Sequence, residues 1–312
     1  MDLRQMRYFV GVAEQLSFSR ASETLNISQS ALSRQIHLFE EELGVRLFDR
    51  IGRSIALTPA GQELLQRCQA ILNDVESVAL RAGELSGGFA GRLRVGATPQ
   101  TLESLVAGFL PGFRASFPQI EITLVEDGSA RLSEQLERGR LDLAIAGRPG
   151  DSVLTGRELF PLGTLAVVPS DSPHLGKPRL DAAELAEESL LLLRRHFLTR
   201  RLFDGACQAA GFAPRVMIES ASPHCLLAFV AAGLGTAIVP STVLLDDLHG
   251  NAVPLYRGAG QLGCAMSILW DPRRYMAPAA TAFVEALHAA TRAHYPGREF
   301  VRDPLPATVS GS

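Results

Sequence analysis

The stretch "NISQSALSRQIHLFEEELG", residues 26–44, decides the fold of the first part of the chain. It contains four apolar residues at steps of four, three and four, which predicts a helix with one buried stripe. These residues are Leu32, Ile36, Phe39 and Leu43. Ser28 is placed to cap the helix, and Gly44 suits the left-handed residue at its end. The stretch therefore predicts one helix between Ser28 and Gly44.

The face of this helix opposite the stripe has residue types that suit DNA. It carries Gln29, Ser30, Ser33, Arg34 and His37. Glutamine can bond adenine bidentately and arginine can bond guanine, while capped amides and serine hydroxyls can bind phosphates. We expect the first two turns to read base sequence in a major groove. The far end carries Glu40, Glu41 and Glu42, which need only stay in solvent, away from the phosphates.

The flanking segments extend this helix to a winged helix-turn-helix. Before it, apolar residues at helical spacing predict one helix, and a second is expected from about Ser19 to Leu25. After it, two short apolar runs flank the polar residues "DRIGR", which predicts a hairpin with Arg50 and Arg53 at its tip. Arginines on such a wing can enter the minor groove. The expected DNA-binding residues are Ser28, Gln29, Ser30, Ser33, Arg34, Arg50 and Arg53.

The charge count leaves a second interpretation open. Residues 1–60 hold seven arginines and seven acidic residues, so their net charge is zero. An interaction bundle without a DNA role would have the same composition. The distribution of charge favours DNA, because the acids of the third helix lie at its far end. Arg34, Arg50 and Arg53 can converge on one side.

Thr58 and Pro59 predict the start of a long helix, as its cap and its first residue. Its apolar residues follow at steps of 4, 3, 4, 3, 4 and 3, a heptad seam over three heptads. They are Leu64, Cys68, Ile71, Val75, Val78, Ala82 and Leu85. A narrow seam with polar flanks predicts a dimerising coiled coil. A helix packed on its own domain remains the alternative.

From Gly91 the pattern changes to short apolar strands alternating with amphipathic helices. Strand, helix and strand at this spacing predict an α/β fold with a parallel sheet. A second round of the same alternation follows, and two late strands lead to a final helix at residues 278–293. Two such lobes in sequence predict a cleft between them, where ligands bind at the carboxyl ends of strands.

Composition limits the other possibilities. The net charge of −3 provides no global positive field, so DNA contact must come from a local patch. The four cysteines are widely spaced without a Cys-x-x-Cys pair, so neither a structural metal nor a cofactor is expected. The start of the chain has no apolar signal core, which favours the cytoplasm. No catalytic motif is recognisable, so an enzyme or a periplasmic-type solute-binding protein is the disfavoured alternative.

Residues 7–65, from "RYFVGVAEQ" to "AGQELL", resemble the amino-terminal domain of LysR-type transcriptional regulators in a dense, collinear match. After Gly91, "FPQIEITLVE", "GRLDLAIAG" and "VAAGLGTAIVP" resemble the effector-binding domain of that family, which has the two-lobed fold of periplasmic binding proteins. The expected domains are DNA-binding (1–58), linker and dimerisation helix (59–88), effector-binding (89–295) and flexible tail (296–312). Lobe I is expected at about 91–160 and 265–295, and lobe II at about 161–264.

The resemblance also implies partners and contacts. It implies a sequence-specific regulator, a homodimer to homotetramer, that bends double-stranded DNA at an interrupted palindrome, with RNA polymerase as a further partner. Many members of the family have proline where this chain has Ser30, a difference that can change a base contact. The implied effector site faces the cleft, at Thr98, Gln100, Thr101, Ser129, Arg148, Arg194, His196, Thr199 and Ser220. Threonines near helix starts suit a carboxylate, so we expect a small anionic effector.

Overall fold

The computed structural model describes residues 1–51, 54–85, 91–148, 150, 152–302 and 305. It divides the chain into two compact units, Met1–Gly88 and Phe89–Ser312. Each unit has hydrophobic cores of its own. Within the described part of the chain, no helix is long and apolar enough to cross a membrane.

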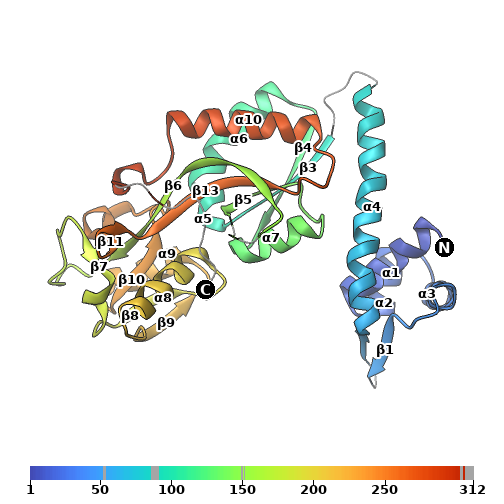
Figure 1. Ribbon diagram of the computed structural model, residues 1–312, viewed down its shortest axis with the longest axis horizontal. Helices are drawn as coiled ribbons and strands as arrows, with labels where there is room; N and C mark the ends of the chain where they lie inside the picture. The colour runs from blue at the N-terminus through green and yellow to red at the C-terminus, as the bar shows by residue number, and fades with distance from the viewer. Residues whose placement is uncertain (52–53, 86–90, 149, 151, 303–304, 306–312) are drawn as a thin grey trace. The chain divides into compact units, whose positions relative to one another are not determined.

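The first unit is a winged helix-turn-helix followed by a long helix (Figure 1). Its elements are α1 (Leu3–Gln15), α2 (Phe18–Thr24), α3 (Gln29–Leu43), β1 (Phe48–Ile51), β2 (Ser54–Leu57) and α4 (Pro59–Leu85). The side chain of Ser28 accepts a hydrogen bond from the backbone of Ala31, and Gly44 ends α3 at φ 70°. Both ends of α3 therefore lie where the sequence predicts them.

Three aromatic rings centre the core of this unit. The ring centroid of Phe9 lies 6.0 Å from that of Phe39 and 5.6 Å from that of Phe48. Leu32 and Ile36 of the predicted stripe are buried beside them, whereas Leu43 is only partly buried. The apolar side of α3 therefore faces the interior, which leaves its polar side to solvent.

The first half of α4 belongs to this same core. Figure 1 shows α1 lying beside that half, while the rest of α4 extends beyond the bundle. Leu64 and Cys68 pack into the core, and Cys68 is only 5% exposed. The prediction that Cys68 faces a partner helix is therefore wrong, because it lies in the core of its own domain, whereas Leu64 is half-buried at the edge of that core. The side-chain amide of Gln69 also donates to Glu14 of α1, at 3.3 Å.

The second unit is a mixed α/β structure of two lobes. Its first elements are β3 (Gly91–Ala97), α5 (Pro99–Thr101), a π-helical turn (Leu102–Val106), α6 (Ala107–Ser116), β4 (Ile120–Glu126), α7 (Ser129–Glu137), β5 (Leu143–Gly147), β6 (Thr155–Val167) and β7 (Leu180–Asp181). There follow a 3-10 turn (Ala182–Leu185), β8 (Leu190–Leu193), α8 (Leu198–Ala209), β9 (Val216–Ser220), α9 (Pro223–Ala231) and β10 (Thr236–Pro240). The last are a 3-10 turn (Asp246–Asn251), β11 (Ala252–Arg257), β12 (Gly260–Gln261), β13 (Gly263–Trp270), α10 (Pro278–Ala293) and a 3-10 turn (Arg298–Phe300).

The strands follow the order β4-β3-β5-β13-β6-β10-β8-β9, with β11 paired to β6, and β12 and β7 paired to β11. β3, β4 and β5 are parallel to one another, as are β8, β9 and β10. β6 and β13 run antiparallel to their neighbours. β6 pairs with β13 up to Gly163 and with β10 and β11 beyond it, so this strand crosses from lobe I to lobe II. The predicted lobe boundaries at residues 160 and 264 therefore fall inside strands.

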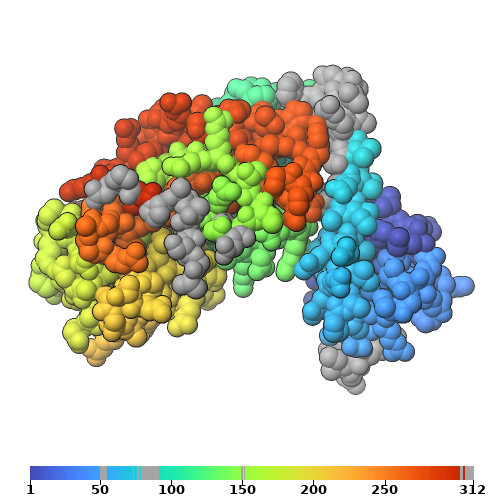
Figure 2. All heavy atoms as spheres, in the orientation of Figure 1, coloured from blue at the N-terminus to red at the C-terminus, as the bar shows by residue number. Residues whose placement is uncertain are grey.

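Helices cover both faces of each lobe. In lobe I, α6 and α10 pack on one face through Phe113 and Phe283, and α7 packs on the other through Leu132 and Leu136. Figure 1 shows α10 lying along the sheet, and Figure 2 shows it forming a broad part of the surface of this unit. In lobe II, α8 covers one face and α9 the other. The central strands β5, β8 and β10 are buried along their whole length, as strands covered on both faces must be.

The residues after α10 depart from the predicted flexible tail. Phe300 is 8% exposed and packs into the core of lobe II beside Val243 and Val239. The side chain of Gln261 donates to the carbonyl of Phe300 at 2.6 Å and accepts from the backbone N–H of Arg302 at 3.0 Å. The prediction of a flexible tail from residue 296 is therefore wrong up to residue 302. The residues beyond it, apart from Leu305, lie outside the described part of the chain.

Candidate DNA-reading face and effector cavity

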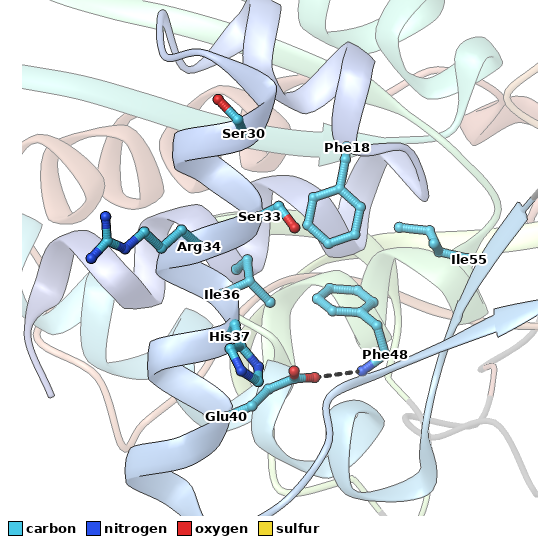
Figure 3. A pocket seen from close by; sticks show the side chains of 9 residues that line it. All are labelled: Phe18, Ser30, Ser33, Arg34, Ile36, His37, Glu40, Phe48 and Ile55. Atoms are coloured by element: carbon cyan, nitrogen blue, oxygen red, sulfur yellow. Dashed lines mark hydrogen bonds between the residues drawn. The ribbon is translucent and has the colours of Figure 1, made fainter.

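The polar side of α3 borders an open hollow in the first unit. The hollow lies between α2, α3 and the hairpin and is lined by Phe18, Ser30, Ser33, Arg34, Ile36, His37, Glu40, Phe48 and Ile55 (Figure 3). Figure 3 shows Ser33 directed toward the ring of Phe18 and Arg34 directed to the other side of the helix. Gln29, Ser30 and Arg34 are exposed and Ser33 is half-buried. This face presents hydrogen-bonding groups over about three turns of helix.

The first turn of α3 is ordered by side-chain hydrogen bonds. The hydroxyl of Ser19, on α2, donates to the amide oxygen of Gln29 at 3.2 Å. The hydroxyl of Ser28 lies 3.3 Å from that of Ser30 and accepts from the backbone N–H of Ala31. Among the described residues, no hydrogen bond or ion pair of Arg34 is found. Its guanidinium can therefore pair with an external acceptor.

The three glutamates at the far end of α3 differ from one another, which corrects the expectation that they only need solvent. Glu40 is half-buried, and its carboxylate accepts from the backbone N–H groups of Leu47 at 2.7 Å and Phe48 at 3.2 Å (Figure 3). It therefore fixes the chain where the hairpin begins. β1 begins at Phe48, the second of these two residues. Glu41 and Glu42 are exposed.

The predicted wing arginines are not settled by the structure. The hairpin itself is present, with β1 paired antiparallel to β2. Arg50 lies on β1, but its side chain, like the whole of Arg53, falls outside the described residues. The wing contacts therefore stay a prediction.

The second half of α4 has exposed apolar side chains. Ile71 is 40% exposed and Val78 is 68% exposed, while Val75 is half-buried. The side chains of Ala82 and Leu85 lie outside the described residues. The predicted seam is therefore buried in its own domain up to Cys68 and exposed from Ile71, about one turn later.

A small cavity lies between the two lobes of the second unit. It is lined by Thr98, Gln100, Thr101, Ser129, Leu162, Phe197, Leu198, Thr199, Pro240, Thr242 and Met266. The space that the centre of a water-sized sphere can occupy is about 10 Å³. The cavity therefore has room for about one water molecule. A larger molecule therefore does not fit the cavity in this arrangement of the lobes. Five of the predicted effector residues line it: Thr98, Gln100, Thr101, Ser129 and Thr199.

The other four predicted effector residues do not line this cavity. Arg194 is exposed, and Arg148 is half-buried beyond the end of β5. Ser220 accepts through its hydroxyl from the backbone N–H of Ser222 at 3.1 Å. His196 instead packs beside Gly128, where an added Cβ would meet its ring carbon Cδ2 at 2.6 Å. The described lining of the cavity therefore contains no ionisable side chain, contrary to the expected arginine or histidine.

Three helix starts and one unpaired amide oxygen give the cavity its polarity. Thr98 precedes the continuous helical segment that begins with α5, Ser129 opens α7, and Thr199 lies in the first turn of α8. The first N–H groups of a helix have no partner within it and carry partial positive charge. The side-chain oxygen of Gln100 is buried without a hydrogen bond in the described structure, and this residue is only 6% exposed. The cavity is therefore bordered by polar groups of both signs, and its described lining carries no formal charge.

Sequence patterns alone missed six lining residues: Leu162, Phe197, Leu198, Pro240, Thr242 and Met266. Leu162 lies on β6 and Met266 lies on β13. Whether these strands reach the cavity depends on the order of strands in the sheet. Thr242 follows the end of β10, a position where ligand-binding residues are expected in α/β sheets. That position was the one available signal.

Lobe II contains a buried arginine that the sequence patterns also missed. Arg200 is 2% exposed and donates to Asp204 at 2.8 Å, to Glu219 at 2.5 Å and to the carbonyl of Leu193 at 2.9 Å. Hydrogen bonding to Arg200 lowers the pKa of Glu219. Because all of its partners are in the same lobe, Arg200 is a structural residue that fixes α8 to β8 and β9.

The cysteines do not add a reactive group to the described lining of the cavity. Burial raises the pKa of Cys207 and of Cys264 to about 12 each, so both are protonated and unreactive at neutral pH. Cys225 is exposed, and it does not line the cavity. Within the residues that the structure describes, no group of three His, Cys, Asp or Glu side chains is placed to hold a metal ion.

A winged helix-turn-helix joined to a two-lobed ligand-binding domain defines a class of ligand-responsive DNA-binding regulators. Two family models match the chain. One, described as bacterial regulatory helix-turn-helix protein, lysR family, matches residues 3–62, and the other, LysR substrate binding domain, matches residues 86–292. The chain belongs to the LysR family of DNA-binding transcriptional regulators, which carry an effector-binding domain.

Individual relatives and structures agree with this assignment. The HTH-type transcriptional regulator TtuA of Agrobacterium vitis is 35% identical over 270 residues, 83% of this chain and 87% of its own length. The transcriptional dual regulator GltC of Bacillus subtilis is 30% identical over 287 residues, 91% of this chain and 96% of its own. Full-length OxyR from Pseudomonas aeruginosa matches with a TM-score of 0.69 at 27% identity, over 94% of this chain and 95% of that one. Full-length CbnR with its target DNA shares the fold, with a TM-score of 0.63 at 24% identity, over 93% and 100% of the two chains.

Proposed function

We propose that the N-terminal half of α3 reads the base sequence of a promoter site. The observation that carries this proposal is the capped, exposed first half of α3, with Gln29, Ser30 and Arg34 facing solvent. Ser28 and Ser33 complete this face, and Arg50 and Arg53 would follow the backbone or the minor groove on the wing. The structure of CbnR that shares this fold contains target DNA, which supports the same use here.

A gel-shift assay with the DNA upstream of the chain's own gene tests this proposal. The intact protein is expected to shift that DNA at low salt, and an equal length of scrambled DNA should compete poorly. For substitutions on α3, Arg67→Ala is a suitable control variant, since Arg67 is exposed on α4 and pairs only with Glu63 in the described structure. A protein that shifts neither DNA, with or without candidate effectors, would exclude the proposed role of α3.

The proposed effector is a small molecule with a carboxylate and an apolar part. The three helix starts and the hydroxyls of the cavity suit the carboxylate, which would displace solvent from N–H groups that have no partner in their helices. Leu162, Phe197 and Met266 provide the apolar wall. The side-chain oxygen of Gln100 needs a donor, which a hydroxyl on the same ligand would provide.

A thermal-shift screen with pairs of compounds tests the effector class. A hydroxy acid is expected to raise the unfolding temperature of the intact protein, and its methyl ester or amide is expected to fail. Stabilisation by neutral or cationic compounds alone would contradict the proposed anion site. Because the cavity holds about one water molecule, binding should also change the angle between the lobes, which small-angle X-ray scattering can detect.

We further propose that the protein works in the cytoplasm as a dimer or tetramer without enzymatic activity. The exposed apolar side chains of the second half of α4, Ile71 and Val78, support pairing of two such helices. Effector binding would alter the lobe angle and, through the paired helices, the bend of the DNA. RNA polymerase is the proposed receiver of that change.

A further inference from the structure

His37 lies on the DNA-facing side of α3, one turn beyond the residues proposed to read bases. Projected along the helix at about 100° per residue, it falls between Ser33 and Arg34. Its side chain is 71% exposed, and it borders the hollow of Figure 3 as well as the neighbouring hollow beside Arg46 and Asp49. Its position continues the polar face at its centre, so a duplex that contacts Ser30 and Arg34 meets His37 next.

The acids around His37 are not equivalent. Glu40 is occupied by the backbone N–H groups that open the hairpin, and Glu42 pairs with the amino terminus at 2.5 Å. Glu41 is the acid that pairs with His37, with 3.3 Å between its Oε1 and the imidazole Nε2. The other charged residues near this imidazole are Arg34 on α3, and Arg46 and Asp49 across the second hollow. The pair His37–Glu41 therefore carries a charge that depends on one proton.

His37 is also the only histidine in residues 1–88. Histidine is the side chain whose ordinary pKa brings its charge change between about pH 5 and 8. The amino group of Met1 pairs with Glu42 at 2.5 Å. Since residues 1–60 have a net charge of zero, one added proton at the centre of the reading face changes the local field appreciably.

We infer that His37 is a further DNA contact of α3, and that it binds the phosphate backbone only when its imidazole is protonated. The inference rests on the proposed role of α3. DNA is a polyanion, so it favours the protonated imidazole over the neutral one, and binding takes up a proton. Affinity for the site is therefore highest at low pH and falls as the pH rises and the imidazole loses its proton. Linkage limits the effect to one proton for each α3 that is bound.

Fluorescence anisotropy of a labelled upstream DNA fragment, at fixed ionic strength from about pH 6 to about pH 8, tests the inference. For the intact wild-type protein we expect Kd to rise about fivefold or more over this range. His37→Gln should bind with a Kd that changes less than about twofold, and His37→Arg should keep the tight binding at both ends of the range. Glu41→Gln should bind more tightly than wild type and keep the pH dependence, because it removes a competing carboxylate. His294→Gln, exposed in the second unit, is the matched control and should behave as wild type.

Two outcomes would overturn the inference, and both differ from failure of the proposed function. One is a wild-type Kd that does not change with pH although the site is bound specifically. The other is the same pH dependence in His37→Gln as in wild type. Absence of specific binding at every pH would instead remove the proposed role of α3. Since 71% of the side chain of His37 is exposed, circular dichroism should show His37→Gln and His37→Arg folded like the wild type.

Discussion

The DNA-reading face and the effector cavity are both polar sites, but they are built in opposite ways. The face comes from one helix, is exposed, and carries an arginine whose charge is free to meet an external partner. The cavity draws on residues from 98 to 266 in the chain, is buried, and has no ionisable side chain in its described lining. In the described structure the exposed face therefore carries formal charge and the buried cavity does not. If the proposed effector is an anion, the helix starts would bind it without the cost of burying a counter-charge.

The largest expected effect is on the DNA side of this comparison. Arg34→Ala should weaken binding to the specific site about a thousandfold, since a dimer loses one base contact of about 2 kcal/mol in each half-site. Effector-induced stabilisation should be unchanged, because the cavity lies in the other unit. Anisotropy and thermal shift on the same preparation measure both. If Arg34→Ala bound the specific site with the same Kd as wild type, the proposed DNA contact of Arg34 would be wrong.

The next effect concerns the proposed pairing of α4 helices, which would hold two DNA-reading faces together in a dimer. Val78→Glu places a charge on the most exposed apolar side chain among the described residues of α4 and should weaken dimerisation about a hundredfold. Cys68→Ser, one and a half heptads earlier, should instead lower the stability of the first unit and leave dimerisation unchanged, because Cys68 is buried in its own domain. Sedimentation equilibrium distinguishes the two. A dimer unaffected by Val78→Glu would show that the exposed seam pairs with nothing.

A smaller effect is expected from Glu40, near the C-terminal end of α3. Glu40→Ala leaves two backbone N–H groups at the start of the hairpin without their acceptor and should destabilise the first unit by about 1–3 kcal/mol. Glu40→Gln keeps an acceptor and should lose less. Glu42→Ala, on the exposed last turn, is the control and should change little. Urea unfolding followed by circular dichroism measures all three, and equal stability of Glu40→Ala and Glu42→Ala would contradict the anchoring role.

The smallest expected effect is on the cavity side. Gln100→Leu should weaken effector binding about tenfold, since the ligand loses one hydrogen bond in a buried site. The same change should leave the free protein as stable as before or slightly more so, because a buried unpaired oxygen is removed. Calorimetric titration and thermal unfolding measure the two parts. A Gln100→Leu protein that binds the effector as tightly as wild type would place the effector elsewhere.

How far each site was predictable from the sequence follows from the same difference. The ends and the faces of α3 were predicted correctly because helix periodicity and capping are local, as at Ser28 and Gly44. The strands and helices of the second unit were largely predicted for the same reason, including α10 over its full length. The crossing of β6 between lobes and the partners of β13 were not, because strand order depends on contacts between distant segments.

The errors in the sites have specific physical causes. Arg148 and Arg194 were expected in the cavity from the family resemblance, but no local pattern tells whether a long side chain in such a loop turns inward. Cys68 fits a heptad seam as well as a domain core, since both need an apolar residue at helical spacing. Glu40 looked like its neighbours in sequence. Its distinction arises only when the chain after Gly44 turns back and presents two N–H groups to it.

The most direct test of whether α3 reads bases is an affinity scan over every single-base variant of the protein's own site. The scan is made with wild type and with Arg34→Ala. Wild type should discriminate at a small set of positions in each half-site, and the variant should lose discrimination at one G·C pair in each while keeping the others. A variant that weakens binding uniformly, with every position still discriminated as in wild type, would show that Arg34 contacts only phosphate and that bases are read elsewhere.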